Sequence, residues 1–376
     1  MKNSALYIHI PFCDHKCIYC DFYSIITSDN VSAYLKSLRR EIEYFSHLYS
    51  EDRIFTSIFF GGGTPSLMEP KYLKEILDHL RKYFAIDDNS EITMETNPGT
   101  VDKSKLKLFK DAGINRISIG IQSFDEKELN FLTRIHDKQT AIHTVYNAAE
   151  VGFDNISVDL IFNLPNQTKE KWIENLETAI RLPIKHLSAY SLILERGTIL
   201  NKLVLDKKVT MQDDDYDADL YETTIDFLVS NGFYQYEVSN FTKPGYECVH
   251  NNAYWRYRDY LSFGTSSHSF VDGKRWWNYS SLKKYISEIE LNNHAIMNSE
   301  IISKEQMHDE YVMLALRSSG LDLNDYRNRF SDDWIKKNYS YFELLKNEHH
   351  LSTDNNWIKL TSKGYAVCDE ILKNIL

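Results

Sequence analysis

Three cysteines stand close together near the start of the chain. Cys13, Cys17 and Cys20 form a C-x3-C-x2-C pattern within FCDHKCIYCDF, and only two further cysteines occur among 376 residues. Three thiolates on one short loop can hold three irons of a [4Fe–4S] cluster and leave the fourth iron open. The open iron could then bind a substrate or a cofactor, so the pattern favours cluster chemistry.

A zinc site is the alternative use of the same thiols. Three cysteines and one further ligand make a common structural zinc site, and His9, His15 or Cys248 could complete it. Unligated thiols are less favoured, because three exposed thiols this close would be prone to oxidation. The odd number and tight spacing do not suit a disulfide framework and favour a reducing cytoplasm.

Further polar and small residues follow other apolar segments. The stretch FFGGGTPS contains Gly61, Gly62 and Gly63, where missing side chains let backbone amides approach a ligand closely. A tight turn explains three glycines equally well when they are considered alone. Glu95 and Asp159 end apolar runs, where a charge needs a partner, either in an ion pair or in a ligand.

Gln122 and Arg134 follow another apolar run, RISIG. An arginine there could pair with a carboxylate through two parallel hydrogen bonds, although a surface salt bridge is the ordinary alternative.

The elements that would carry these residues alternate in type along the first half of the chain. Six short β-rich runs begin at Leu6, Ser57, Glu91, Arg116, Ile156 and His186, with helical patterns between them. This alternation predicts a parallel α/β fold, a partial (β/α)6 barrel of the TIM type. Most of the candidate residues fall at the carboxyl ends of these strands, at the rim where such barrels carry their chemistry.

The pattern changes after about residue 200. A long acidic helix is predicted from Asp213 to Asn231, followed by strand-like and aromatic-rich segments. Helices are then predicted over 304–316, 322–330 and 334–346, and a hairpin over 350–361 turns at Asp354, Asn355 and Asn356. We therefore expect a barrel domain over 1–285 and a small, helical, winged-helix-like domain over 300–376.

Composition limits the classes of partner. The formal net charge of −11 opposes general binding to nucleic acid. Because no run of about 18 apolar residues and no export signal is seen, we expect a cytoplasmic protein without a membrane span.

The motifs together resemble a known family. The cysteine pattern resembles that of the radical S-adenosylmethionine (SAM) superfamily, in which the open iron binds SAM and one-electron transfer cleaves it to methionine and a 5′-deoxyadenosyl radical. Over about residues 5–280, YIHIPFC, FGGGTPS, ETNPG, RISIGIQSF, LTRIHD, DLIFNLP and YQYEVSNFTKPGYECVHNNAYW are similar to oxygen-independent coproporphyrinogen III oxidases and their relatives, the HemW haem chaperones.

This resemblance implies a role for each matching residue. It implies a [4Fe–4S] cluster on the three cysteines of the loop. It also implies contacts with SAM from a set of residues in the matching motifs: Tyr7, Phe22, Gly62, Gly63, Thr64, Glu95, Gln122, Arg134 and Asp159. An electron donor such as flavodoxin or ferredoxin would supply the reducing electron.

Two features separate the subgroups of this family. The oxidases carry a further cysteine two residues after the third, whereas Phe22 stands at that position here. They also carry a long N-terminal extension, whereas the first predicted strand here begins almost at once. Both differences favour the chaperones, which bind haem and deliver it to client haemoproteins, over decarboxylation of coproporphyrinogen III.

The stretch HNNAYW, residues 250–255, matches the HNxxYW motif of the chaperones. His250 is the best candidate for a haem ligand, and Cys248 is the second. Tyr254 and Trp255 could pack on a porphyrin face. The ordinary alternative is a histidine that is hydrogen-bonded inside an aromatic core.

Overall fold

The computed structural model describes residues 1–27, 29–354 and 356–376. Six parallel strands lie side by side in chain order, as the sequence predicts. They are β1 (Lys2–Ile10), β2 (Arg53–Gly62), β3 (Ile86–Thr96), β4 (Arg116–Gln122), β5 (Asn155–Phe162) and β6 (His186–Ser191). Because all six run the same way, their carboxyl ends form one rim, which carries the cysteine loop.

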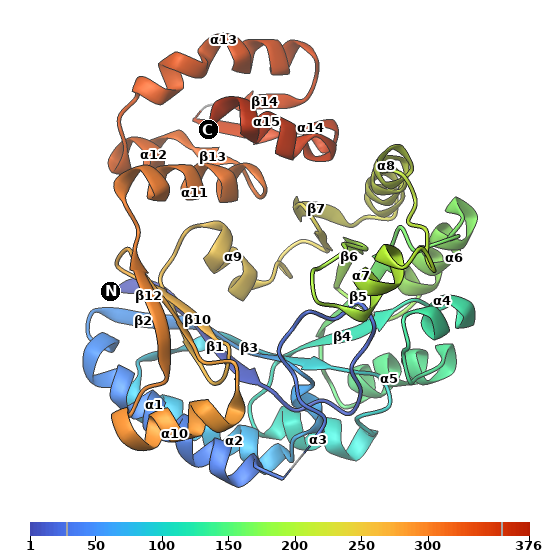
Figure 1. Cartoon of the computed structure of the whole chain (residues 1–376). Coiled ribbons are helices and arrows are strands. Elements are labelled where there is room, and N and C mark those ends of the chain that lie inside the picture. Colours follow the sequence, from blue (N-terminus) through green and yellow to red (C-terminus); the bar gives the residue numbers. More distant parts are fainter. Residues whose placement is uncertain (28, 355) are drawn as a thin grey trace.

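Helices connect these strands and cover the outer face of the sheet (Figure 1). They are α1 (Val31–Tyr49), α2 (Pro70–Tyr83), α3 (Lys103–Asp111), α4 (Glu126–Phe131), α5 (Lys138–Glu150) and α6 (Lys169–Ile180). The helix α2 shows why these segments fold as they do. It begins with Pro70 in its first turn and buries Leu73, Ile76, Leu77 and Leu80, which the 3.6-residue repeat gathers on one face.

In the part of the chain that the structure describes, the sheet continues on both sides of the six strands, to twelve strands. At one side β9 (Tyr260–Phe263) pairs with β1 in parallel and is followed by β10 (His268–Val271), β11 (Lys274–Asn278) and β12 (Ile296–Ile301). At the other side lie β8 (Asn240–Thr242) and β7 (Tyr234–Glu237). Within the described residues the edge strands β12 and β7 do not pair with each other, so the barrel is open, as predicted.

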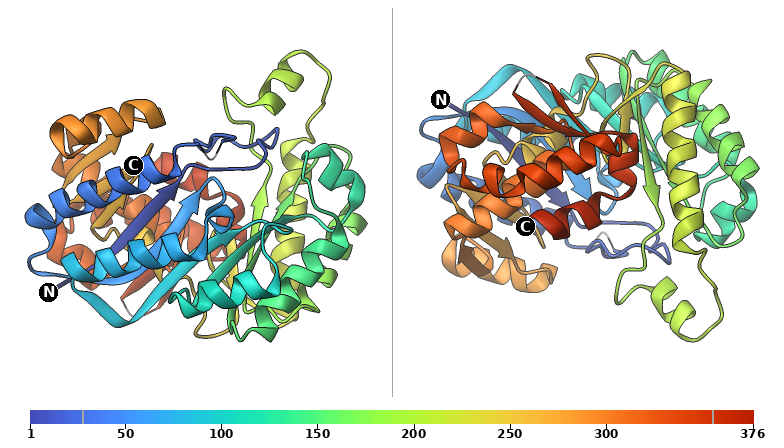
Figure 2. Two further views of the ribbon diagram at one scale, coloured as in Figure 1. Left: turned by 90° about the horizontal axis from the view of Figure 1, so that it is seen from below. Right: turned by 90° about the horizontal axis from the view of Figure 1, so that it is seen from above.

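Four helices accompany the later strands: α7 (Ile199–Leu205), α8 (Asp214–Ser230), α9 (Val249–Trp255) and α10 (Leu282–Asn292). The long acidic helix of the sequence prediction is α8. The helix α9 contains the HNNAYW motif and packs against β1 and β2. Seen from below, the cysteine loop crosses the rim of the barrel (Figure 2).

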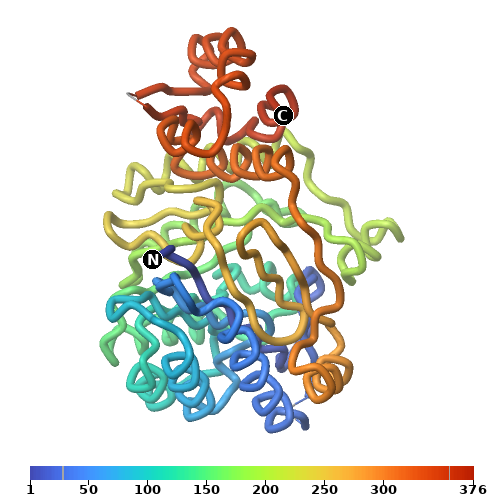
Figure 3. The backbone as a smooth tube through the Cα atoms, turned by 90° about the vertical axis from the view of Figure 1, so that its left-hand side faces the viewer, coloured from blue at the N-terminus to red at the C-terminus, as the bar shows by residue number. Residues whose placement is uncertain are grey.

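The C-terminal segment forms its own core above the barrel (Figures 1 and 3). Its elements are α11 (Lys304–Leu316), β13 (Leu321–Asp322), α12 (Leu323–Arg329), α13 (Asp333–Asn347), β14 (Leu351–Asp354), β15 (Trp357–Leu360), α14 (Ser362–Ala366) and α15 (Cys368–Ile375). The three predicted helices and the hairpin are confirmed to within two residues, and Asn355 of the predicted turn lies outside the described residues.

The boundary between the two predicted domains, at residues 285 and 300, remains a prediction. The large sheet includes β12 and so extends to Ile301, while the C-terminal core begins at Tyr311. No helix in the described part of the chain is long and apolar enough to cross a bilayer.

Candidate functional site

The cysteine loop leaves β1 and is closed at its base by backbone hydrogen bonds. The amide of Ile25 donates to the carbonyl of Pro11 over 2.8 Å, and the amide of Cys13 donates to the carbonyl of Ile25 over 3.0 Å. Cys13, Cys17 and Cys20 are all partly exposed between these anchor points. The loop therefore presents three thiols at the carboxyl-end rim of the barrel.

The glycine stretch at the end of β2 packs directly against this loop. The amide of Gly63 donates to Ile10 over 2.7 Å, and that of Thr64 donates to Phe12 over 2.8 Å. A Cβ atom on Gly63 would lie 2.5 Å from the carbonyl oxygen of Phe12. Because that oxygen belongs to the backbone, only glycine permits this close approach.

Polar contacts link the first two cysteines through Thr64, Asn97 and Arg134, which lie in the segments after β2, β3 and α4. The Sγ atom of Cys13 lies 3.2 Å from Oγ1 of Thr64, which accepts a hydrogen bond from Asn97 over 2.9 Å. The Oδ1 atom of Asn97 accepts from Arg134 over 2.8 Å, and Nη1 of Arg134 donates to Sγ of Cys17 over 3.5 Å. Sequence reasoning missed Asn97, although an amide just after a strand, in ETNPG, was a usable signal.

Arg134 is partly buried and belongs to the site rather than to a surface salt bridge. Its Nη2 atom also donates to the carbonyl of Gly120 over 2.6 Å. Gln122 lies nearby at an irregularity in β4, with a left-handed φ of 73° that turns the chain at the rim. A cation in this setting is suited to hold a carboxylate.

Two carboxylates point into the barrel beside these residues. Oε2 of Glu95 accepts from the amide of Gly62 over 3.1 Å, and Asp159 accepts from Ser118 and Ser188. Burial, together with the charge of Asp159, raises the pKa of Glu95 to about 7, and burial also raises the pKa of Asp159. Both anions would gain from a cationic ligand, such as an ammonium group.

The candidates for a fourth zinc ligand are not gathered with the three thiols. Within the described residues no three His, Cys, Asp or Glu side chains are gathered as a metal-binding group. Each candidate for a fourth ligand is engaged elsewhere: His9 with Tyr7 and Tyr23, and His15 with Thr133. Cys248 is fully buried, where burial raises the pKa of its thiol to about 12.

Tyr7 and Phe22 line a cavity of about 410 Å³ that opens beside the cysteine loop. Phe22 is 64% exposed. Tyr254 from the HNNAYW motif and His268 at the start of β10 form further parts of the wall. We call this cavity the rim groove; the sequence did not predict it.

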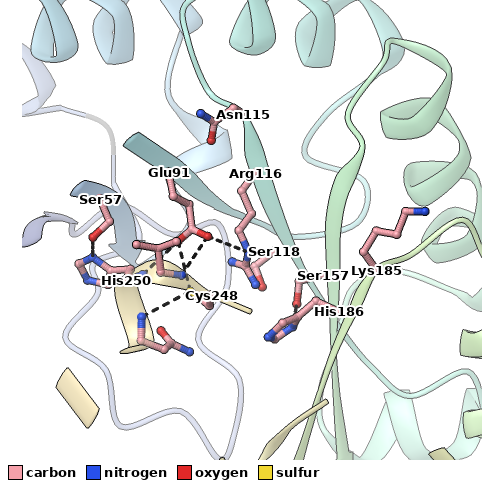
Figure 4. A network of polar contacts seen from close by, with 12 residues as sticks. Ser57, Glu91, Asn115, Arg116, Ser118, Ser157, Lys185, His186, Cys248 and His250 are labelled. Carbon is pink, nitrogen blue, oxygen red and sulfur yellow. Dashed lines mark hydrogen bonds and ion pairs between the residues drawn. The ribbon is translucent and has the colours of Figure 1, made fainter. Parts of the chain in front are cut away.

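His250 is 1% exposed and lies beside Ser57 (Figure 4). Its Nδ1 atom lies 3.0 Å from the hydroxyl of Ser57, and its Nε2 atom lies 3.0 Å from the hydroxyl of Tyr254. Burial lowers its pKa to about 3, so the ring is neutral. This geometry matches the alternative of a histidine hydrogen-bonded inside an aromatic core, since both nitrogens are occupied.

A buried carboxylate holds the start of α9 (Figure 4). Glu91 accepts hydrogen bonds from the amides of Val249 and His250, each over 3.1 Å, and from the thiol of Cys248 over 3.4 Å. The Nε atom of Arg116 lies 3.8 Å from Glu91. The HNNAYW motif is thus fixed from strand β3, which also carries Glu95 at its rim end.

Comparison with protein families adds to this description. Residues 7–179 match the model of the Radical SAM superfamily. This span contains all three loop cysteines, the glycine stretch and both rim carboxylates.

Curated relatives cover nearly the whole chain. The heme chaperone HemW of Bacillus subtilis is 35% identical over 99% of this chain and 98% of its own length. That of Lactococcus lactis is 32% identical over 100% of this chain and 98% of its own length. The heme chaperone HemW of Escherichia coli is 39% identical over 72% of this chain and 71% of its own length.

Among solved structures, coproporphyrinogen III oxidase (HemN) of Escherichia coli, described as a radical SAM enzyme, aligns with a TM-score of 0.84. The alignment covers 100% of this chain and 90% of the other, at 23% sequence identity. At that identity the likeness establishes the shared fold.

Proposed function

The chain belongs to the radical SAM superfamily and, within it, to the family of the heme chaperone HemW, and on this premise we propose that it binds haem and transfers it to client haemoproteins. The observation that carries this proposal is the full-length similarity to the chaperones. It is supported by Phe22, which stands where the oxidases have a further cysteine, and by the open, aromatic-lined groove beside the cluster loop.

Cys13, Cys17 and Cys20 would hold a [4Fe–4S] cluster, which supplies one-electron reduction of SAM when both are bound. The residues of the rim would bind SAM itself. Arg134 suits its carboxylate, Glu95 and the backbone carbonyl oxygens of Gly62 and Gly63 suit its amino group, and Asp159, Gln122 and Thr64 extend the polar wall. Tyr7 and Phe22 supply apolar surface next to the loop.

The remaining partners follow from the same proposal. The electron would come from a donor such as flavodoxin or ferredoxin, and the protein would act in the cytoplasm, where its thiols stay reduced. The clients would be haemoproteins of the same cell.

Haem transfer tests the proposal. Purified protein is reconstituted with iron and sulfide without oxygen, loaded with haem, and mixed with an apo-haemoprotein whose own spectrum reports haem uptake. We expect faster uptake than from free haem, and no formation of protoporphyrinogen IX from coproporphyrinogen III in the presence of SAM and a reductant. Formation of that product would contradict the chaperone function and favour the oxidase activity. Purified protein that contains zinc and no iron would contradict the proposed cluster.

A further inference from the structure

The rim groove contains an imidazole that neither the family resemblance nor the HNNAYW motif assigns. His268 is the first residue of β10, and its side chain is exposed in the wall of the groove. Strand β10 is joined through β9 to β1, which carries the cysteine loop. His268 therefore lies on the same side of the barrel as the proposed cluster.

The imidazoles of His9 and His268 line this groove, and that of His250 lies next to it; the three differ in what their nitrogens bind. His9 is engaged at Nδ1 by the hydroxyl of Tyr7, at 3.2 Å, and at Nε2 by the carbonyl of Tyr23, at 2.9 Å. His250 has both nitrogens engaged, one of them by Tyr254. No hydrogen bond to the ring of His268 is formed from the described part of the chain, so His268 alone offers a free nitrogen.

Its neighbours hold the free ring in a fixed orientation. His268 is paired with Trp277 across the antiparallel strands β10 and β11, and the two rings stack with centroids 5.8 Å apart and planes 19° from parallel. Partial burial lowers the pKa of His268 below 6.5, and the charge of Arg275 acts in the same direction. A neutral imidazole keeps the lone pair that haem iron requires.

The rest of the groove suits a flat aromatic ligand. Phe22, Tyr254 and Tyr260 line it, and the exposed ring of Phe22 would lose contact with water if it packed on a porphyrin face. Asp21 is a carboxylate in the lining and would repel the propionates of haem, which would therefore lie toward solvent. An edge left in solvent suits a protein that must give haem up again.

We propose that His268 is the axial ligand of haem iron in the rim groove, and that His250 is a positioning residue that holds Tyr254 in the wall. This proposal rests on the haem-binding function proposed above. It differs from the sequence-based expectation, because the structure encloses His250 and leaves His268 open.

Haem titration of the full-length, reconstituted protein tests the proposal, with absorption and electron-spin spectra as readouts. We expect wild-type protein to bind one haem with an imidazole-ligated spectrum. In His268→Ala we expect at least a tenfold loss of affinity and loss of that signature. In His268→Cys we expect binding with a thiolate-ligated spectrum, which a merely structural role at this position would not produce.

His143→Ala is the matched control, since His143 is an exposed imidazole on α5, outside the groove. We expect its spectrum and affinity to equal those of wild type. His250→Gln should bind haem more weakly but keep the imidazole signature.

Spectra equal to that of wild type in both His268 variants, or an equal loss of haem affinity in His143→Ala and His268→Ala, would overturn the assignment of His268 as the ligand. Neither result would contradict haem binding by the wild-type protein. Loss of the imidazole signature in His250→Gln alone would assign the ligand to His250 instead. Absence of any haem binding by the wild type would refute the proposed function itself, and the assignment with it.

Discussion

The guanidinium of Arg134 lies against the thiol of Cys17, with Nη1 3.5 Å from Sγ, although 117 positions separate them in the sequence. The same side chain holds Asn97 and the carbonyl of Gly120. It therefore connects one proposed cluster ligand to the carboxyl ends of β3 and β4, and its other face is suited to the carboxylate of SAM.

Replacement of Arg134 by lysine should weaken SAM binding more than it weakens the cluster. Lysine keeps the positive charge but cannot donate two parallel hydrogen bonds to a carboxylate, as the planar guanidinium does. We therefore expect roughly tenfold lower affinity for SAM, which is a loss of about 1.4 kcal/mol in binding free energy. The measurement is the change that SAM causes in the electron-spin spectrum of the reduced cluster. Arg39→Lys, at an exposed pair with Glu75, is the control and should bind SAM normally.

Alanine at Gly63 should displace the cysteine loop. Its Cβ atom would meet the backbone of Phe12 at 2.5 Å, whereas a Cβ atom on Gly61 would meet only side-chain atoms, at 3.0 Å or more. After reconstitution we expect Gly63→Ala to hold much less iron per chain than Gly61→Ala. Equal iron contents would contradict a requirement for close packing between the glycine stretch and the loop.

Loss of the charge on Glu91 should destabilise the fold. Glu91→Gln would leave Arg116, which is 2% exposed, without its anionic partner, and breaking such a buried pair costs about 3 kcal/mol or more. Thermal unfolding should show a clearly lower Tm. The control is Asp78→Asn, which removes an exposed pair with Lys74 that is worth at most about 1 kcal/mol.

SAM affinity should depend on pH through Glu95. Its pKa is raised to about 7, so the carboxyl group is mostly neutral below that pH and charged above it. Because the charged form attracts the protonated amino group of SAM, affinity should rise several-fold from about pH 6 to about pH 7.5, below the pH at which the amino group itself loses its proton. In Glu95→Gln we expect weaker binding with a flatter pH profile; a rise as steep as in the wild type would assign the titration to another group.

The raised pKa of Glu95 also makes the stability of the fold depend on pH. A carboxyl group whose pKa is higher in the folded state than in the unfolded state stabilises the fold at low pH, and this contribution is lost as pH rises through about 7. Without ligand, Glu95→Gln should therefore gain stability relative to wild type as pH rises from about 5 to about 8, as measured by chemical unfolding at each pH.

The sequence by itself determined the order of the elements and the chemistry of the rim. Alternating β-rich and helical runs gave the six parallel strands, because the two-residue and 3.6-residue repeats mark which side chains are buried. The three cysteines, the glycine stretch and the two carboxylates could be recognised because each lies at or near the carboxyl end of a predicted strand, and parallel strands bring their carboxyl ends to one edge.

Tertiary structure decided which polar groups remain free. The sequence singled out His250 through its motif and not His268, yet the first has both nitrogens occupied by Ser57 and Tyr254, while the second is open beside Trp277. The hydrogen bond between Asn97 and Arg134 could not be predicted from the sequence either. Hydrogen-bond partners and exposure depend on residues far apart in the chain, and periodicity and spacing describe only near neighbours.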